Sequence, residues 1–137
     1  MANNAMTGDD RKRLVEGYIE HHTKRFVWGA DNVLRQQDVN FWTWEKLDQL
    51  VRDEPETAWD IILEVMNNTE DEFTLSCLAA GALEDLIRRH GARFIDRIER
   101  QAKSDARFRE LLCGVWRGST PEVWARIEAL QEGQFNR

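Results

Sequence analysis

Two adjacent carboxylates, Glu84 and Asp85, are the residues of this chain best placed for chemistry. They follow the apolar half of the segment 71–91, DEFTLSCLAAGALEDLIRRHG, whose early residues are hydrophobic on nearly every side of a helix. Such a helix must be surrounded by other helices. On a helical wheel Glu84 stands at the edge of a packed face. The pattern is therefore consistent with a carboxylate that lines a cleft, where it would bind a ligand or serve an enzyme.

Local pairing offers a different explanation of the same two carboxylates. Glu84 precedes Arg88 by four residues and Asp85 precedes Arg89 by four, and each such pair stabilises a helix by about 0.2–0.5 kcal/mol. Alternatively, Glu84 is a buried carboxylate that accepts a hydrogen bond from an indole or a helix end. The sequence does not decide between a carboxylate in a cleft, a carboxylate paired with arginines of its own helix, and a buried carboxylate that anchors a neighbouring segment.

Other patterns that carry catalysis or metal binding are missing. His21 and His22 point about 100° apart on a helix, and no histidine pair has the four-residue spacing of a zinc site. Ser76 and Cys77 lie in no nucleophile motif. We therefore expect no catalytic residue, no metal and no cofactor. His90, next to Gly91, is expected to complement the end of a helix.

Aromatic residues are the second candidate for function, since the chain has six tryptophans. Trp59, Trp116 and Trp124 fall on predicted core faces. Trp42 and Trp44 flank a predicted helix start and, together with a neighbouring phenylalanine, cannot all face inward. An exposed tryptophan is a common anchor of protein interfaces. The alternative is that several indoles simply cover a small core.

Charge is distributed unevenly along the chain, which has a formal net charge of −6. Residues 31–75 contain twelve acidic and three basic side chains, whereas residues 76–137 contain nine acidic and eleven basic ones. An acidic region favours a basic protein partner and disfavours nucleic acid. We expect the basic residues after position 88 to be compensated by acids of their own helix. The predicted binding residues are Trp42, Trp44, Asp48, Asp53, Glu56, Asp60, Glu84 and Asp85.

Helices are the elements that must position these residues. Capping residues, three- and four-residue apolar spacing, and the two prolines predict seven of them. Their expected ranges are 9–28, 43–52, 55–66, 71–91, 93–103, 105–116 and 120–130. Within the fourth, Gly81 is expected to allow close approach of a neighbouring helix.

We therefore expect one all-α domain over residues 9–132, between a disordered lead-in at 1–8 and a tail at 133–137. Pro55 and Pro121 each precede a tryptophan on the second helix of a predicted hairpin. This weak echo favours antiparallel hairpins stacked as a short solenoid over an irregular bundle. No apolar run approaches the roughly 20 residues of a membrane span. Two free cysteines and the lack of a secretory signal indicate a cytoplasmic protein.

The block LAAGALEDLIRRHG, followed by FIDRIERQA, FRELLCGVW and a final VW, resembles a bacterial family of small helical proteins of unknown function. The resemblance spans about residues 44–126 and is most specific at 78–91. Ala82 stands where the family pattern often has proline, which favours an unbroken helix here. The resemblance implies kinship and a bacterial origin, and it supplies no activity.

Three hypotheses of function follow. The first is a protein-binding module, an inhibitor of the immunity or antitoxin type that meets a basic partner. The second is a scaffold module that associates with itself through its tryptophan-bearing face. The third is a small-ligand-binding or enzymatic protein with a carboxylate cleft at Glu84 and Asp85. The oligomeric state is open.

Overall fold

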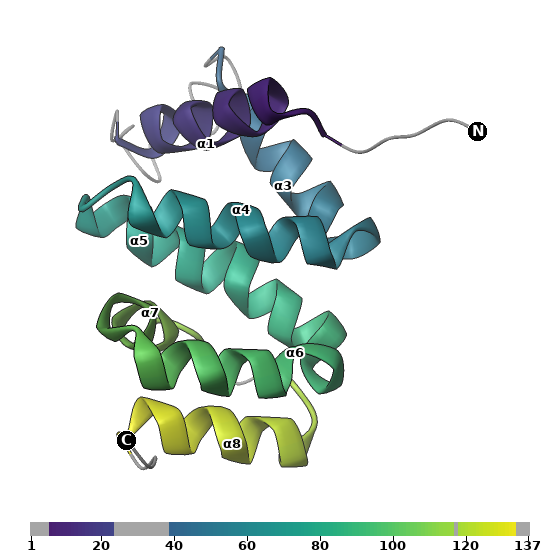
Figure 1. Ribbon diagram of the computed structural model, residues 1–137, viewed down its shortest axis with the longest axis vertical. Coiled ribbons are helices and arrows are strands. Elements are labelled where there is room, and N and C mark those ends of the chain that lie inside the picture. Colours follow the sequence, from purple (N-terminus) through teal and green to yellow (C-terminus); the bar gives the residue numbers. More distant parts are fainter. Residues whose placement is uncertain (1–5, 24–38, 117, 134–137) are drawn as a thin grey trace, which may run out of the picture.

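The computed structural model describes residues 6–23, 39–116 and 118–133, and every regular element in these ranges is a helix. The expected all-α fold is confirmed (Figure 1). The elements are α1 (Gly8–Thr23), α3 (Phe41–Asp53), α4 (Pro55–Asn67), α5 (Glu72–Leu78), η1 (Ala79–Leu83), α6 (Glu84–Ser104), α7 (Ala106–Leu112) and α8 (Pro121–Gln131). In these ranges no helix is long and apolar enough to cross a membrane.

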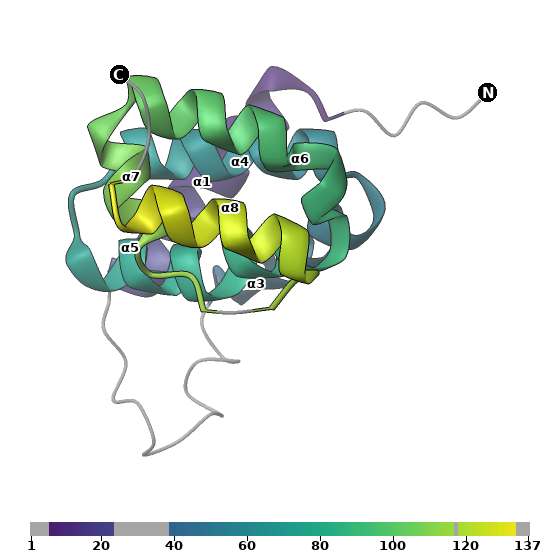
Figure 2. The ribbon, with the colours of Figure 1, turned by 90° about the horizontal axis from the view of Figure 1, so that it is seen from below.

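The helices are stacked in layers along the long axis of the molecule (Figure 1). α1 lies at one end and packs against α3, α4 and α5, while α8 lies at the other end and packs against α6 and α7. From below, α3 and α5 are seen along one side, with α4 and the second half of α6 on the other (Figure 2). One continuous cluster of buried side chains runs from Leu14 in α1 to Leu130 in α8. This order of layers matches the predicted stack of hairpins.

The central helix is built from α5, η1 and the first part of α6. Its side chains Leu78, Leu83 and Leu86 are fully buried. Ala80 and Gly81 are exposed, however, so the expectation that other helices surround this helix on every side is wrong. Asp71 caps its first turn by accepting the backbone N–H of Thr74 at 3.0 Å. η1 is a single π-helical turn, which widens the backbone where four small residues precede Leu83.

A kink divides α6 at His90, whose backbone angles (φ −132°, ψ 24°) are not helical. The helix then reverses direction and runs back along α8 (Figure 1). The His90 Nε2–H donates to the carbonyl of Val51, 2.8 Å away. In a continuous helix that carbonyl would accept the N–H of residue 55, but Pro55 has none. His90 therefore complements the end of α3 rather than the end of its own helix.

Side chains from later layers satisfy other helix ends in the same way. Arg107 donates to the carbonyls of Met66 and Thr69 at the end of α4, at 2.6 and 2.7 Å. Gln131 donates to the carbonyls of Leu112 and Val115 after α7. The last carbonyls of a helix lack partners within the helix, so these bonds offset a desolvation cost.

Two predicted helix boundaries are wrong. α3 begins at Phe41, and Thr43 lies in its first turn, where its hydroxyl donates to the carbonyl of Asn40. α7 ends at Leu112 instead of continuing to Trp116. Trp116 is consequently 76% exposed and does not join the core. The predicted end of the first helix, at residues 24–28, lies outside the described residues.

Glycines at two helix contacts have roles that the sequence did not reveal. A Cβ at Gly17 would meet Thr43 Cγ2 at 2.7 Å, and one at Gly91 would meet Ser119 Oγ at 2.7 Å. Gly91 is therefore a contact point for the segment before α8, not a helix cap. A Cβ at Gly81 meets nothing within 4 Å, so the expected close approach at Gly81 is wrong.

Alanine substitutions should distinguish a glycine at a close helix contact from a glycine with open space around it. We expect Gly17→Ala to destabilise the protein by about 1–3 kcal/mol, because the added methyl forces α1 and α3 apart. Gly81→Ala should leave stability unchanged or raise it by up to about 1 kcal/mol, because alanine favours helix. Urea unfolding of the two variants tests this, and equal midpoints would contradict it.

Candidate binding surface and adjoining groove

Helix α3 exposes both of its tryptophans. Leu47, Leu50 and Val51 are buried against the neighbouring layers, which turns the remaining faces of the helix toward solvent. Trp42 is 38% exposed and Trp44 42% exposed. Both indoles are thus accessible at the start of the same helix.

Neighbouring side chains hold the two indoles in place. The guanidinium carbon of Arg13 lies 5.9 Å from the centre of the Trp42 ring, within the range of a cation–π contact. Phe41 stacks on Trp44 with ring centres 5.7 Å apart and an angle of 19° between the planes. These contacts orient the indoles before any partner arrives.

Carboxylates accompany the tryptophans along α3. Asp48 pairs with Arg52 at 3.5 Å, and Asp53 accepts a 3.3 Å hydrogen bond from the Gln49 amide. Glu45 is exposed and makes no ion pair with any described residue. We define the α3 surface as the outward-facing residues Trp42, Trp44, Glu45, Asp48 and Asp53, with Trp42 on the flank near α1 and Trp44 on the opposite flank. Four of its five members were predicted as binding residues.

Glu56 and Asp60, also predicted as binding residues, hold helices together instead. Glu56 binds Arg93 at 2.9 Å and Arg97 at 2.6 Å, both from α6. The hydrogen bond from Arg97, followed by that from Arg93, lowers the pKa of the Glu56 carboxyl despite some desolvation. Asp60 pairs with Arg11 of α1 at 3.5 Å. Neither carboxylate belongs to the α3 surface.

The basic residues of α6 are compensated only partly within their own helix as expected: Arg88 and Arg89 pair with Asp85 of α6, whereas Arg93 and Arg97 pair with Glu56 of α4. Besides the pairs with Glu56, Arg126 of α8 binds Asp96 at 2.7 Å and donates its Nε–H to Glu99 at 2.9 Å. The hydrogen bond from Arg126 lowers the pKa of Glu99. These pairs join α4, α6 and α8.

A groove of about 520 Å³ adjoins the α3 surface. One wall is α3, with Trp44, Asp48 and Val51, and the other is the start of α6. The π-helical turn supplies its small residues between the two walls. The groove is lined by Tyr18, His22, Trp44, Leu47, Asp48, Val51, Cys77, Ala80, Gly81, Ala82, Asp85, Arg88 and Arg89. It brings together three predicted residues, Trp44, Asp48 and Asp85.

Asp85 holds both arginines of the α6 wall. Its Oδ1 accepts from Arg88 at 2.9 Å and its Oδ2 from Arg89 at 3.1 Å. The expected Asp85–Arg89 pair is confirmed, whereas Arg88 bonds to Asp85 instead of forming the expected hydrogen-bonded pair with Glu84. The hydrogen bond between Arg88 and Asp85, followed by the negative charges of Asp85 and Glu84, raises the pKa of Arg88.

Glu84 is a structural anchor. Its Oε1 accepts the backbone N–H of Trp116 at 2.8 Å, which ties the segment after α7 to the central helix. Glu84 is not among the residues that line the groove. Of the alternatives left open by the sequence, the anchor is the one that this contact supports, although the donor is a backbone amide and not an indole.

Several groove residues were not foreseen. Tyr18 and His22 come from α1, where the His22 Nδ1–H donates to the carbonyl of Tyr18 at 2.8 Å. Ala80 and Ala82 flank Gly81 in η1. The only signal in the sequence was the run of small residues, AAGA, which we interpreted as a helix contact.

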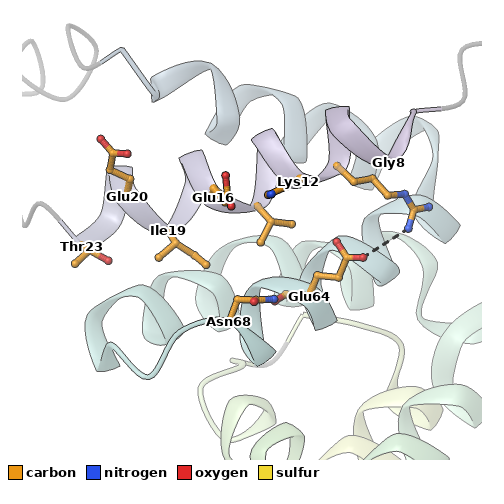
Figure 3. Close-up of a pocket in the computed structure, with 10 residues that line it drawn as sticks. Gly8, Lys12, Glu16, Ile19, Glu20, Thr23, Glu64 and Asn68 are labelled. Carbon is orange, nitrogen blue, oxygen red and sulfur yellow. Dashed lines mark hydrogen bonds and ion pairs between the residues drawn. The ribbon is translucent and has the colours of Figure 1, made fainter.

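A larger hollow, of about 750 Å³, lies between α1 and α4 (Figure 3). Glu64 of α4 and Asn68, the residue after α4, face α1 across it, and Glu64 pairs with Arg11 at 3.9 Å (Figure 3). It contains none of the predicted binding residues. Among the described residues, no three histidine, cysteine or acidic side chains are grouped to hold a metal ion.

Substitution of Glu84 tests its role as an anchor. Glu84→Ala should cost about 0.5–1.5 kcal/mol of stability and raise hydrogen exchange at the Trp116 amide, because that amide loses its acceptor. Glu84→Gln keeps an oxygen at the same place and should retain most of the protection. Exchange measured by NMR at Trp116 would contradict the anchor if both variants matched the wild type.

Comparison with known proteins places the chain in a family. A family model described as a family of unknown function, DUF6869, matches residues 30–135, which include α3 to α8 but not α1. No curated protein and no solved structure shows significant similarity to the chain. The match covers well over half of the sequence, and it agrees with the expected uncharacterised family. The chain therefore belongs to the family of unknown function DUF6869.

Proposed function

We propose that this chain is a protein-binding module that recognises a basic protein through the α3 surface. In this proposal it acts as an inhibitor of the immunity or antitoxin type in the bacterial cytoplasm. The observation that carries the proposal is the exposure of both Trp42 and Trp44 beside the carboxylates of the same helix.

Energetics support a protein as the ligand of this surface. Tryptophan is enriched among the residues that dominate binding energy, because a large indole loses much water on burial. Phe41 and Arg13 already orient the two rings, so little side-chain entropy remains to be lost on association. Carboxylates around such anchors speed the encounter with a basic partner.

Self-association through the same surface is a weaker alternative. In a two-fold symmetric dimer each surface meets its own copy. Glu45, Asp48 and Asp53 would then face the same three carboxylates, and the nearby cations Lys46, Arg52 and Arg13 already contact Gln49, Asp48 and Trp42 of their own copy. A partner of opposite charge fits this surface better.

The carboxylate cleft at Glu84 and Asp85 is also less well supported. Glu84 is engaged by the Trp116 amide, and Asp85 is engaged by two arginines. Neither carboxylate is placed to act on a substrate while these contacts persist. A protein interface is therefore the function that the geometry supports best.

The test is capture of a partner with the full-length chain from cells of its source, followed by binding of the two purified proteins. The double substitution Trp42→Ala/Trp44→Ala should weaken binding by about 100-fold or more, since each hot-spot tryptophan contributes roughly 2 kcal/mol or more. Binding should also weaken as salt increases. Trp116→Ala is the matched control, because Trp116 is more exposed but lies between α7 and α8.

Three results would contradict the proposal. One is a partner that is not basic or whose binding ignores salt. Another is an equal loss in the Trp116→Ala control. The third is a wild-type dimer in sedimentation that the double substitution dissociates, which would assign the α3 surface to self-association.

A further inference from the structure

The groove beside the α3 surface has features of a ligand site in its own right. We propose that it binds a carboxylate joined to an apolar body. The carboxylate lies against Arg88 and Arg89, and the apolar body lies between Trp44 and the small residues of η1. This inference does not depend on the proposed protein partner.

The α6 wall presents an excess of positive charge to the groove. Arg88 and Arg89 share the single carboxylate of Asp85, whose side chain is only 15% exposed. The guanidinium side chains are 56% and 48% exposed. Each guanidinium has five N–H donors, and each hydrogen bond to Asp85 uses one of them. The open donors match the geometry of a second carboxylate.

Asp48, on the opposite wall, does not cancel this charge. It is paired with Arg52 at 3.5 Å along α3. Glu84 also acts on Arg88 through its charge, but it accepts from the Trp116 amide and does not line the groove, so the charged groups that α6 turns into the groove are Asp85, Arg88 and Arg89. An anion is the ligand charge that this wall favours.

The remainder of the groove is suited to an apolar group. Ala80, Gly81 and Ala82 present almost no side chain, and a Cβ at Gly81 meets nothing within 4 Å. Trp44 supplies an aromatic wall. The volume of about 520 Å³ lies within the roughly 300–1,000 Å³ of small-molecule sites. π-Helical turns such as η1 recur at functional sites, because the widened backbone leaves room for a ligand.

Two sources can supply this chemistry: a free organic acid, and the C-terminal residue of a peptide. Both present one carboxylate next to an apolar side chain. The probes of the experiment distinguish the two sources.

The experiment is NMR titration of the full chain, followed at the Trp44 indole and the Gly81 amide. The probes are 3-phenylpropionate, its neutral amide, acetate, and the peptide Gly-Gly-Phe with a free or an amidated C-terminus. We expect saturable shifts with phenylpropionate and at least tenfold weaker binding of the amide and of acetate. Tighter binding of the free peptide than of phenylpropionate would identify a peptide terminus as the ligand, and the reverse order would identify a free acid.

Asp85→Asn is the most discriminating variant. It removes the internal carboxylate that competes for Arg88 and Arg89, so it should tighten phenylpropionate binding about three- to tenfold. If the pairs of Asp85 with the two arginines were purely structural, this substitution would not tighten phenylpropionate binding.

Gly81→Leu tests the apolar part of the groove. The leucine side chain should fill the space and abolish binding. Gly8→Leu is its matched control, because a Cβ at Gly8 also meets nothing within 4 Å but lies outside the groove.

Equal binding of phenylpropionate and its amide would overturn the inference. Weaker binding by Asp85→Asn, or equal binding by the two leucine variants, would do so as well. These results leave the proposed protein partner untouched, since neither Asp85 nor Gly81 belongs to the α3 surface. Conversely, failure to find a partner leaves the titration result intact.

Discussion

The hydrogen bond from His90 to the Val51 carbonyl is the contact on which the site depends most. Pro55 lets α4 start directly after α3, but it leaves that carbonyl without its usual donor. His90 reaches it only because the helix breaks at His90 itself. The bond therefore goes together with the kink and links α6 to α3. Those two helices are the walls of the groove, and α3 carries the exposed tryptophans.

Side chains that donate hydrogen bonds to the carbonyls at helix ends also explain how the stacked helices keep their order and orientation. Arg107 and Gln131 serve the ends of earlier helices, and Ser119 donates to the Ile87 carbonyl just before the kink, at 3.2 Å. Each donor comes from a later part of the chain than the carbonyl it serves. Because these bonds are directional, they fix the order and orientation of layers that apolar burial alone would leave free to slide.

Local rules predicted the helices well and the site only in part. Pro55, Asp71 and Thr120 mark helix starts through chemistry that lies within a few residues, so the sequence was sufficient there. The prediction that Trp116 joins the core was wrong because α7 ends early. That ending depends on hydrogen bonds from the segment after α7 to Glu84 and Gln131, which lie elsewhere in the chain. The ion pairs of Glu56 could not be predicted for a related reason: its arginine partners lie 37 and 41 residues away in the sequence. The exposure of Trp42 and Trp44 could be predicted, because neighbouring aromatic residues cannot all face inward. The groove could not be predicted, because it forms only where three helices meet.

The role of the His90–Val51 hydrogen bond is tested most directly by measuring which nitrogen of the His90 ring carries a proton. Heteronuclear NMR of the imidazole nitrogens should show a proton on Nε2, the atom that donates to the Val51 carbonyl. His90→Ala should shift the Trp44 indole and Gly81 amide resonances while the helices persist, because the two walls lose their link. A ring protonated at Nδ1, together with unchanged Trp44 and Gly81 resonances in His90→Ala, would contradict it.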